Sequence, residues 1–446
     1  MIKRGHLTHD CCNMQYPADD LNGHGEADGL TIQRQPSIRA VPSPLAGETP
    51  SIDNLSLKCH KVNRIFLMKT NHQIVIGNAS AMETVADQSI DLVVTSPPYP
   101  MIQMWDELFC AANPTIEKAL STCETDLAFE SMHRILDRIW SEVRRVIHPG
   151  GLVCINIGDA TRTFDSQFQL FANHARIISA FNALGFSQLP AILWRKPTNA
   201  PNKFMGSGML PPGGYVTLEH EFILIFRWGA KREFPLEEQK QLRRESAYFW
   251  EERNHWFSDV WFDLRGVGQQ ISGQKNMDRS GAFPLELPYR LIHMFSVKGD
   301  TVLDPFLGTG TTMLAAMCSG RNCIGFECDP ALKTVILQRV ASIPKIANQI
   351  VARRVEQHLM FVDEKTKTRG SLKHINRHYG FPVVTRQEED LRLDTIHDIR
   401  FIGADRVCVT HEEFKLQRGQ TQGQPSSDQP RVMPAPVYRG RQLKLF

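Results

Sequence analysis

The sequence predicts an α/β fold with a Rossmann-like sheet that carries helices on both faces. Between residues 62 and 343, short apolar runs that look like buried strands alternate with amphipathic stretches at helical spacing. Continuous apolar runs are typical of parallel strands that are covered on both sides. The chain has 446 residues, of which 42% are hydrophobic and 22% charged, so it can bury a large core. Wholesale disorder is therefore excluded.

Seven apolar runs are predicted to form the strands of this sheet. They cover residues 74–76, 91–95, 152–157, 189–194, 221–226, 301–304 and 322–326. Four helices are expected between and after these strands. Their apolar positions fall in residues 135–147, 168–181, 313–317 and 335–340, and Gly or Pro follows each of the first three stretches. Most of these apolar positions are interpreted as core.

Three regions lie outside this alternation. Residues 1–61 are rich in Pro, Gly, Ser, Asp and His without sustained periodicity, and are predicted to be a disordered leader. Residues 229–277 are charge-dense yet aromatic, and form an insertion within the domain of residues 62–343. Residues 344–446 begin with a basic run, regain short apolar stretches and end in Gln, Ser and Pro. That region is predicted to be a C-terminal extension with a disordered tail.

Composition narrows the class of protein. Lys and Arg total 51 and Asp and Glu total 48, so a nucleic-acid-binding surface has to be a local patch. The ten cysteines show neither CxxC pairs nor the Cys/His spacing of a zinc site. This pattern predicts free thiols in a reducing cytoplasm and no metal. No apolar run approaches the roughly 20 residues that span a bilayer, so no membrane partner is expected.

The first chemical signal is Thr95-Ser96-Pro97-Pro98-Tyr99, directly after an apolar strand. The two prolines end the strand and fix the backbone, which leaves the Ser96 side chain and the Pro97 carbonyl as hydrogen-bond acceptors. Ligands bind at the carboxyl ends of strands in an open α/β sheet. Tyr99 adds an aromatic face on which a nucleobase can stack. The alternative is an ordinary strand-ending turn with a packed tyrosine.

The second signal is a strand that ends at Asp304 and continues as PFLGTGTT into a helix. Gly308 and Gly310 allow a ligand to approach the backbone closely, and the amino end of the helix faces the same point. The lysine of a Walker A loop and the third glycine of a dinucleotide fingerprint are absent, which argues against ATP and NAD. The alternative is a tight turn without a ligand.

The third signal is Glu327, at the end of the strand that follows the glycine turn. It stands about twenty residues after the turn, where a carboxylate can accept hydrogen bonds from both hydroxyls of a ribose. A helix cap or a solvated charge is the alternative interpretation.

Together, these motifs resemble the amino-methylating DNA methyltransferases, in the group whose catalytic tetrapeptide precedes the glycine turn. The resemblance covers residues 74–340 and includes the linking stretches HPGGLVCINIGD, WRKP, FPLELP and DPF. It implies S-adenosylmethionine as cofactor and a seven-stranded sheet whose last strand is antiparallel. It also implies a circularly permuted order, in which the strands at 301–304 and 322–326 are the first two and the other five follow.

The resemblance further implies roles for individual residues. The catalytic tetrapeptide consists of Ser96, Pro97, Pro98 and Tyr99. The residues implied to bind the cofactor are Asn78, Phe283, Pro284, Asp304, Phe306, Gly308, Gly310 and Glu327. Asn78 stands where relatives often have Asp, and its amide oxygen accepts a bond from the adenine amino group less strongly than a carboxylate. Trp105 and Asp106 are candidates for the border of the base pocket, and a core role is the alternative for Trp105.

The implied activity is methyl transfer to the N4 amino group of cytosine in duplex DNA. Ser in the first tetrapeptide position is frequent among cytosine-N4 enzymes, whereas Asp or Asn dominates among adenine-N6 enzymes. Adenine-N6 methylation stays the alternative. Family habit adds a companion restriction endonuclease as a functional partner. A catalytically inactive DNA-binding protein of the same fold is the rival from another class, although the intact motifs favour the enzyme.

Two regions are candidates for contacts with DNA. The insertion at 229–277 is expected to recognise the target sequence, with a plain solvated helix as the alternative. The basic run at 353–377 is better suited to phosphates than to bases, with a charged linker as the alternative.

Overall fold

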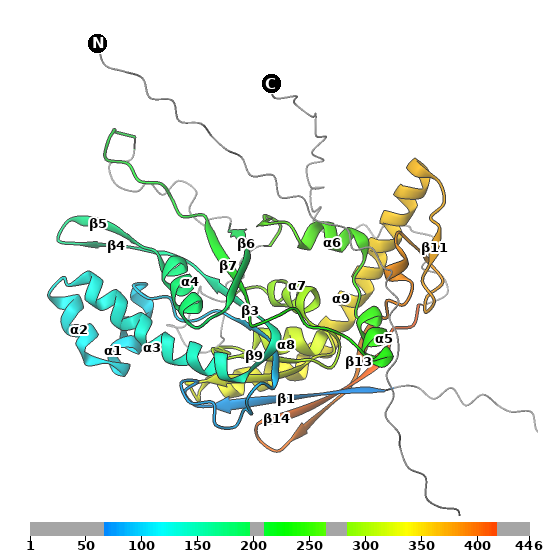
Figure 1. Ribbon diagram of the computed structural model, residues 1–446, viewed down its shortest axis with the longest axis horizontal. Coiled ribbons are helices and arrows are strands. Elements are labelled where there is room, and N and C mark those ends of the chain that lie inside the picture. Colours follow the sequence, from blue (N-terminus) through cyan, green and yellow to red (C-terminus); the bar gives the residue numbers. More distant parts are fainter. Residues whose placement is uncertain (1–66, 197–208, 265–282, 417–446) are drawn as a thin grey trace, which may run out of the picture. The chain divides into compact units, whose positions relative to one another are not determined.

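The computed structural model describes residues 67–196, 209–264 and 283–416, which are coloured in Figure 1. The predicted leader at 1–61, the last part of the insertion at 265–277 and the tail from residue 417 lie outside the described residues. Within the described ranges, ten strands form one mixed sheet.

The strand order places the parallel part of the sheet in its middle. From edge to edge the order is β13 (Asp394–Ile402), β14 (Arg406–Glu413), β1 (Met68–Ile76), β10 (Asn322–Glu327), β9 (Thr301–Asp304), β2 (Ile90–Thr95), β3 (Ile147–Ile157), β7 (His220–Arg227), β6 (Ser187–Arg195) and β8 (Val260–Trp261). The five strands from β1 to β3 in this order are parallel to one another. β7 is antiparallel to both of its neighbours. The carboxyl ends of the parallel strands therefore meet along one edge, where ligands bind in such sheets.

All seven predicted strands are present, and the α/β fold is confirmed. The number of strands was predicted too low, because β8, β13 and β14 extend the sheet at its two edges. β14 pairs antiparallel with β1, from Met68 opposite His411 to Gln73 opposite Arg406. Only one residue of β13 is buried, so its sequence lacks the continuous apolar run that marks a buried strand. The circularly permuted order stays a prediction.

Helices cover both faces of the sheet, as predicted. Along β2, Leu92 and Val94 belong to one apolar cluster and Val93 to another, because successive side chains of a strand point to opposite faces. The helices of the first cluster are α7 (Glu286–Phe295), α8 (Thr311–Cys318) and α9 (Leu332–Arg369). Those of the second are α1 (Asp106–Ala112), α2 (Pro114–Ser121), α3 (Thr125–Val146) and α4 (Asn173–Ala183). The sheet is thus a central layer between two sets of helices (Figure 1).

The second predicted helix is shorter than expected. Its first part, Gln167–Phe171, is strand β5, which forms a hairpin with β4 (Ala160–Phe164). The hairpin turns at Asp165 and Ser166, whose φ angles of 45° and 67° lie in the left-handed region. Helix α4 begins only at Asn173. Apolar side chains on one side of a hairpin were therefore misread as the first turns of a helix.

Helix α9 runs through the predicted boundary between residues 343 and 344. It spans 38 residues and contains Pro344. Its second half shares an apolar cluster with the insertion and with the C-terminal region. The buried members of this cluster are Phe249, Val351, Val355, Phe381, Val383, Leu391 and Leu393. Because these three segments share a core, the boundary at 344 does not coincide with the end of an element, and the division into domains stays a prediction.

The insertion and the C-terminal region are otherwise built from short elements. The insertion contributes α5 (Glu237–Glu245), α6 (Trp250–Trp256) and β8, and the C-terminal region adds the small sheet of β11 (His374–Ile375) and β12 (Pro382–Val383). Two single turns of 3-10 helix occur at Gln103–Trp105 and Arg386–Glu388.

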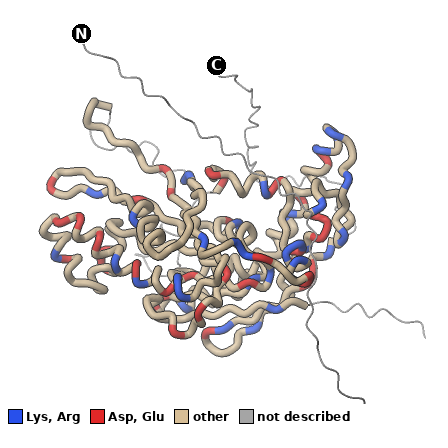
Figure 2. Tube along the Cα trace, viewed as in Figure 1, with Lys and Arg blue, Asp and Glu red and all other residues tan. Residues whose placement is uncertain are grey.

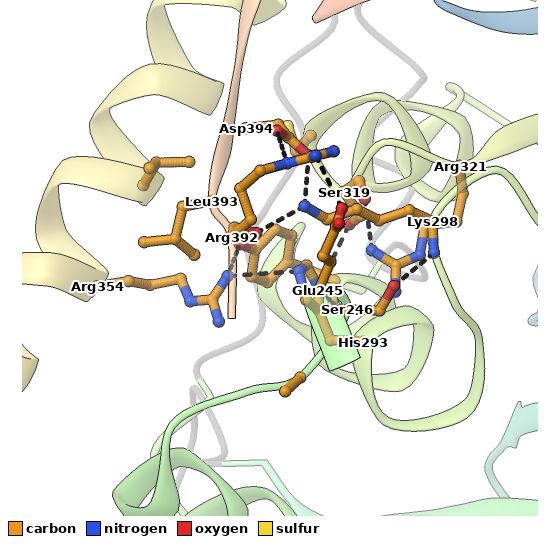
Figure 3. A pocket seen from close by; sticks show the side chains of 14 residues that line it. Glu245, Ser246, His293, Lys298, Ser319, Arg321, Arg354, Arg392, Leu393 and Asp394 are labelled. Atoms are coloured by element: carbon orange, nitrogen blue, oxygen red, sulfur yellow. Dashed lines mark hydrogen bonds and ion pairs between the residues drawn. The ribbon is translucent and has the colours of Figure 1, made fainter. Parts of the chain in front are cut away.

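A cluster of largely buried charged residues joins the insertion to α7, α8 and α9 and to the C-terminal region. It surrounds a cavity of about 20 Å³, room for about one water molecule (Figure 3). Lys298 forms an ion pair with Asp394 at 2.5 Å and donates to the carbonyl of Arg392 at 2.6 Å. Arg392 pairs in turn with Glu245 of α5 at 2.7 Å. Burial lowers the pKa of Lys298 to about 8. The size of the cavity and its internal pairing indicate a structural role.

Candidate active site

The two main motifs meet at the carboxyl ends of neighbouring parallel strands. β2 leads into the tetrapeptide, and β9 leads into the glycine turn after Asp304. The Thr95 hydroxyl donates to Asp304 Oδ1 at 2.6 Å, although the two residues are 209 positions apart. The Thr312 hydroxyl of α8 donates to the carbonyl of Val94 at 3.3 Å. The predicted catalytic corner and the predicted cofactor turn are therefore held in direct contact.

Tyr99 stands at the centre of a hydrogen-bond network that also includes Ser96. Its hydroxyl donates to Glu221 Oε2 at 3.0 Å and accepts from Asn156 Nδ2 at 3.0 Å. The hydroxyl oxygens of Ser96 and Tyr99 are 3.2 Å apart. Asn156 Nδ2 also donates to Glu221 Oε2 at 2.7 Å, and Lys196 forms an ion pair with Oε1 of the same carboxylate. Burial and the charge of Glu221 raise the pKa of Tyr99 well above its usual value, so the phenol stays protonated.

The strands β3, β7 and β6, on one side of β2, supply the partners of Tyr99. Asn156 lies on β3 and Glu221 on β7, which pair with each other, and Lys196 directly follows β6. Gly158 leaves room for the tyrosine ring, since a Cβ there would lie 3.0 Å from Tyr99 Cε2. The ring is half-buried, and its predicted stacking on a nucleobase stays a prediction.

The glycine turn adopts backbone conformations that favour glycine. The φ angle is +54° at Gly308 and +86° at Gly310, where α8 begins. The Gly308 amide donates to Glu327 Oε2 at 2.7 Å. A Cβ on Gly308 would meet only the Phe306 carbonyl oxygen, at 4.0 Å, whereas a Cβ on Gly310 would lie 3.0 Å from Ile336. The turn is therefore open at Gly308 and closely packed at Gly310.

Asp304 is buried at the point where the two motifs join. Its Oδ1 accepts from the Thr95 hydroxyl and from the Phe306 amide, the latter at 3.0 Å. Burial raises the pKa of Asp304 to about 6. A cationic group that binds nearby would stabilise the charged carboxylate and lower this pKa.

Glu327 and Asn78 lie at the ends of the neighbouring strands β10 and β1. The Gly77 amide donates to the carbonyl of Glu327 at 2.9 Å, which holds the two strand ends together. The Glu327 carboxylate accepts from the Gly308 amide and, at 2.8 Å, from the Asp329 amide. Asn78 is exposed, and its Oδ1 accepts from the backbone amide two residues later at 2.9 Å. Each of these oxygens has a second lone pair with which it can accept a bond from a ligand.

The remaining residues predicted to bind the cofactor make packing contacts. Phe283 is buried in the same apolar cluster as α7 and α8, and Pro284 is half-buried with its carbonyl accepting from the Leu287 amide at 3.1 Å. The half-buried Phe306 ring lies edge-on to Trp140, with centroids 5.7 Å apart. Their contacts with a cofactor stay predictions.

The roles of Asn156, Glu221 and Lys196 were not predicted from the sequence. Asn156 interrupts an apolar strand, and Glu221 comes at the start of another, where a polar side chain needs a partner when it is buried. Asn156 and Lys196 also stand in two of the linking stretches that carried the resemblance. The pairing of Asn156 with Glu221, 65 positions later, depends on the order of strands in space.

The two residues proposed for the border of the base pocket have partners of their own. Trp105 packs against the second apolar cluster, which favours its core interpretation. The Asp106 carboxylate accepts hydrogen bonds from both terminal nitrogens of Arg162, which lies on β4, at 3.0 and 2.6 Å. This bidentate pair ties α1 to the β4–β5 hairpin.

The candidate DNA-contacting regions are only partly exposed. In the insertion, Phe249, Trp256 and Trp261 are buried, whereas Trp250, Phe257 and Phe262 are exposed. In the basic run, Arg354 is buried and pairs with Glu252 at 2.6 Å. The predicted contact with a phosphate is therefore wrong for this residue. Figure 2 shows the other Lys and Arg residues of this part of the chain interspersed with Asp and Glu. Both regions stay candidates through their exposed residues alone.

The described ranges contain neither a metal-binding cluster nor a membrane-spanning helix. No group of three or more His, Cys, Asp and Glu side chains there could hold a metal ion, and the cysteines of these ranges are free thiols. No helix in the same ranges is long and apolar enough to cross a membrane.

Comparison with known proteins identifies the family. The family model described as DNA methylase matches residues 90–339. The Type II methyltransferase M.MthZI of Methanothermobacter thermautotrophicus is 54% identical over 327 residues, 73% of this chain and 91% of that protein. M.MjaI of Methanocaldococcus jannaschii, also a Type II methyltransferase, is 50% identical over 282 residues, 61% of this chain and 91% of its own. The crystal structure of TTHA0409 from Thermus thermophilus, complexed with S-adenosyl-L-methionine, shares 31% identity at a TM-score of 0.47 and covers 61% of this chain and 95% of its own. This chain therefore belongs to the DNA methylase family.

Proposed function

We propose that this DNA methylase transfers the methyl group of S-adenosylmethionine to the N4 amino group of cytosine in duplex DNA. The observation that carries the proposal is the hydrogen bond from Thr95 to Asp304, which holds the tetrapeptide beside the glycine turn. Cytosine is proposed as the target base because of the resemblance to the amino-methylating DNA methyltransferases. Serine, here Ser96, is frequent in the first tetrapeptide position among cytosine-N4 enzymes.

The tetrapeptide suits the chemistry of an exocyclic amino group. Such a nitrogen is conjugated with the base and is a poor nucleophile. The Ser96 oxygen and the Pro97 carbonyl would accept bonds from its two hydrogens, which stabilises the nitrogen as it becomes tetrahedral and positive. The base has to leave the duplex to reach this corner, and Tyr99 would stack on it. No thiolate is needed, and burial raises the pKa of the Cys154 thiol.

The strand ends beside this corner fit the proposed cofactor. S-adenosylmethionine supplies, when bound, a methyl group on a positively charged sulfur. Glu327 would accept bonds from the ribose hydroxyls and Asn78 from the adenine amino group. An added Cβ on Gly77 would meet no atom within 4 Å, and one on Gly308 would meet a single oxygen at 4.0 Å, so both flanks of Glu327 are open. Asp304 would favour the positively charged methionine end.

The identity of the methylated base tests this proposal. The purified protein is incubated with duplex DNA and S-adenosylmethionine that carries an isotope-labelled methyl group, and the digested nucleosides are resolved by mass spectrometry. We expect the label in N4-methylcytosine. Label in N6-methyladenine instead would show that the target base is adenine. No labelled nucleoside, from a folded protein that binds duplex DNA, would favour the inactive DNA-binding alternative.

The affinity for S-adenosylmethionine is expected to fall as the pH drops through about 6. Below the raised pKa of Asp304, which is about 6, the free protein holds a neutral carboxyl group. Binding of a cationic ligand then requires loss of this proton, which weakens binding by up to about tenfold per pH unit. Asp304→Asn keeps an oxygen that can accept from Thr95 and Phe306, yet it should bind more weakly at pH 7.5 and lose the pH dependence.

Titration calorimetry between pH 5 and pH 8 checks this prediction. The matched control is Asp398→Asn, which makes the same change on the exposed edge strand β13 and should leave the wild-type profile intact. A flat wild-type profile, or wild-type affinity in Asp304→Asn, would contradict the assigned role.

We also propose that the methylation protects DNA from a companion restriction endonuclease in the cytoplasm. The support is that M.MthZI and M.MjaI are named Type II methyltransferases. Sequencing DNA from cells that express the protein, with detection of methylated bases, would give the target site, and DNA methylated there should resist an endonuclease of the same specificity.

A further inference from the structure

We propose that Glu221 is a positioning residue for methyl transfer. Acting through Tyr99, it fixes the direction of the Ser96 hydroxyl proton, so that the Ser96 oxygen presents a lone pair to the target amine. The inference rests on the proposed function and gives a role to a residue outside the tetrapeptide. It is carried by the hydrogen bonds that join Ser96, Tyr99, Asn156 and Glu221.

The chemistry of the four groups fixes the direction of each bond. The Tyr99 hydroxyl has one hydrogen but three polar side-chain neighbours, at 3.2 Å (Ser96), 3.0 Å (Glu221) and 3.0 Å (Asn156), and the Gly158 backbone amide is a further donor to it. An ionised carboxylate can only accept, so the tyrosine hydrogen points to Glu221. The Asn156 amide nitrogen can only donate, so Tyr99 accepts from it. The remaining bond must then run from the Ser96 hydroxyl to the Tyr99 oxygen.

This direction matters because a serine hydroxyl can both donate and accept. With its hydrogen turned toward Tyr99, the Ser96 oxygen has only lone pairs to offer to a ligand. If the tyrosine hydrogen instead pointed to Ser96, the serine hydrogen would be free to point at the target amine, whose hydrogens need an acceptor. A carboxylate or amide oxygen in the same position would carry no hydrogen and would need no such control.

Glu221 is itself held firmly in place. Asn156 donates to Oε2, and Lys196 pairs with Oε1, so each carboxylate oxygen has a partner. The side chains of Glu221 and Lys196 are 12% and 26% exposed, and Lys196 also lies 4.6 Å from the centroid of the Trp194 ring. A charge that is withdrawn from water to this degree is costly unless it is paired, and the pairing keeps Glu221 an acceptor. The contacts thus run in sequence from Lys196 to Ser96.

A double-mutant cycle tests the proposal. The rate of a single methyl transfer is measured at saturating DNA and S-adenosylmethionine for the wild type, Glu221→Gln, Tyr99→Phe and the double variant. We expect each single variant to lose about 10- to 100-fold in rate, by analogy with the removal of a partner that orients a metal ligand from behind. The double variant should be no slower than the slower single variant, because both changes break the same chain of bonds. Affinities for DNA and cofactor should stay within about twofold of the wild type.

Glu219→Gln is the matched control. Glu219 lies just before β7, and its carboxylate pairs with Arg195 at 3.0 Å at an exposed position, so its rate should equal that of the wild type. Losses that multiply in the double variant, or a wild-type rate in either single variant, would overturn the proposal. If Glu221→Gln lowers the melting temperature, the transfer rate of Tyr99→Phe alone tests the proposal, because this variant loses only the hydroxyl. A wild-type protein without any transfer would refute the proposed function instead.

Discussion

Replacing Ser96 with alanine is expected to lower methyl transfer by about 10²- to 10³-fold, the loss found when one oriented partner is removed from a transition state. The hydroxyl lies at the carboxyl end of β2 and is half-buried beside Tyr99. Alanine removes an acceptor that the target amine would meet as its nitrogen becomes positive, but leaves the backbone of the corner unchanged. The loss should therefore fall on the rate of transfer, with DNA binding still measurable.

Single-turnover rates and duplex affinities separate these two effects. Ser89→Ala is the matched control, since Ser89 is exposed just before the opposite end of the same strand and its hydroxyl donates to the carbonyl of Ala86. It should have the rate of the wild type. Unchanged transfer by Ser96→Ala would remove the tetrapeptide from the reaction. A lost affinity for DNA with an unchanged rate would give Ser96 a binding role instead.

Replacing Arg354 with methionine is expected to lower the free energy of unfolding by about 3 to 5 kcal/mol, the range for removal of one partner from a buried ion pair. Arg354 donates to both oxygens of Glu252, at 2.6 and 2.8 Å, and to the Tyr289 hydroxyl at 3.1 Å. Its side chain and that of Glu252 are 8% and 12% exposed. Methionine would fill much of the space but leave the carboxylate without its cation.

Denaturant unfolding of matched variants measures this loss. Arg353→Met changes the preceding residue, which is exposed, and should alter stability by no more than about 0.5 kcal/mol. The double variant Glu252→Met with Arg354→Met removes both charges and should regain much of the lost stability. A loss below about 1 kcal/mol in Arg354→Met would show that the pair contributes like a surface ion pair.

The buried strands and the chemical motifs could be predicted because each is encoded locally. The strand predicted at 301–304 is β9, Thr301–Asp304, since burial on both faces requires an uninterrupted apolar run. The tetrapeptide and the glycine turn were placed at strand ends by their prolines and glycines, whose backbone preferences are intrinsic. The bond from Thr95 to Asp304 joins the two motifs, which each follow the carboxyl end of a strand.

What could not be predicted depends on pairing across the fold. Nothing near Glu221 in the sequence indicates that it accepts from Tyr99, because the two residues are 122 positions apart, one on β7 and the other in the segment after β2. The insertion was described as charge-dense and aromatic, but its sequence does not show that Phe249 stacks on His358 of α9, with ring centroids 4.0 Å apart. The edge strand β13 is solvated on much of its surface, so its residues carry no strong apolar pattern.

The pairing of β1 with β14 has a consequence for synthesis on the ribosome. Thr70 bonds through its hydroxyl to His411, a residue made 341 positions later, and that contact lies within the strand pair. A nascent chain therefore carries both chemical motifs long before it can cover the edge of β1. An uncovered edge can pair with other chains, so aggregation competes with folding until β14 has been synthesised. In the folded protein this edge of the sheet is β13 instead, and its residues Asp398 and Arg400 place charges there.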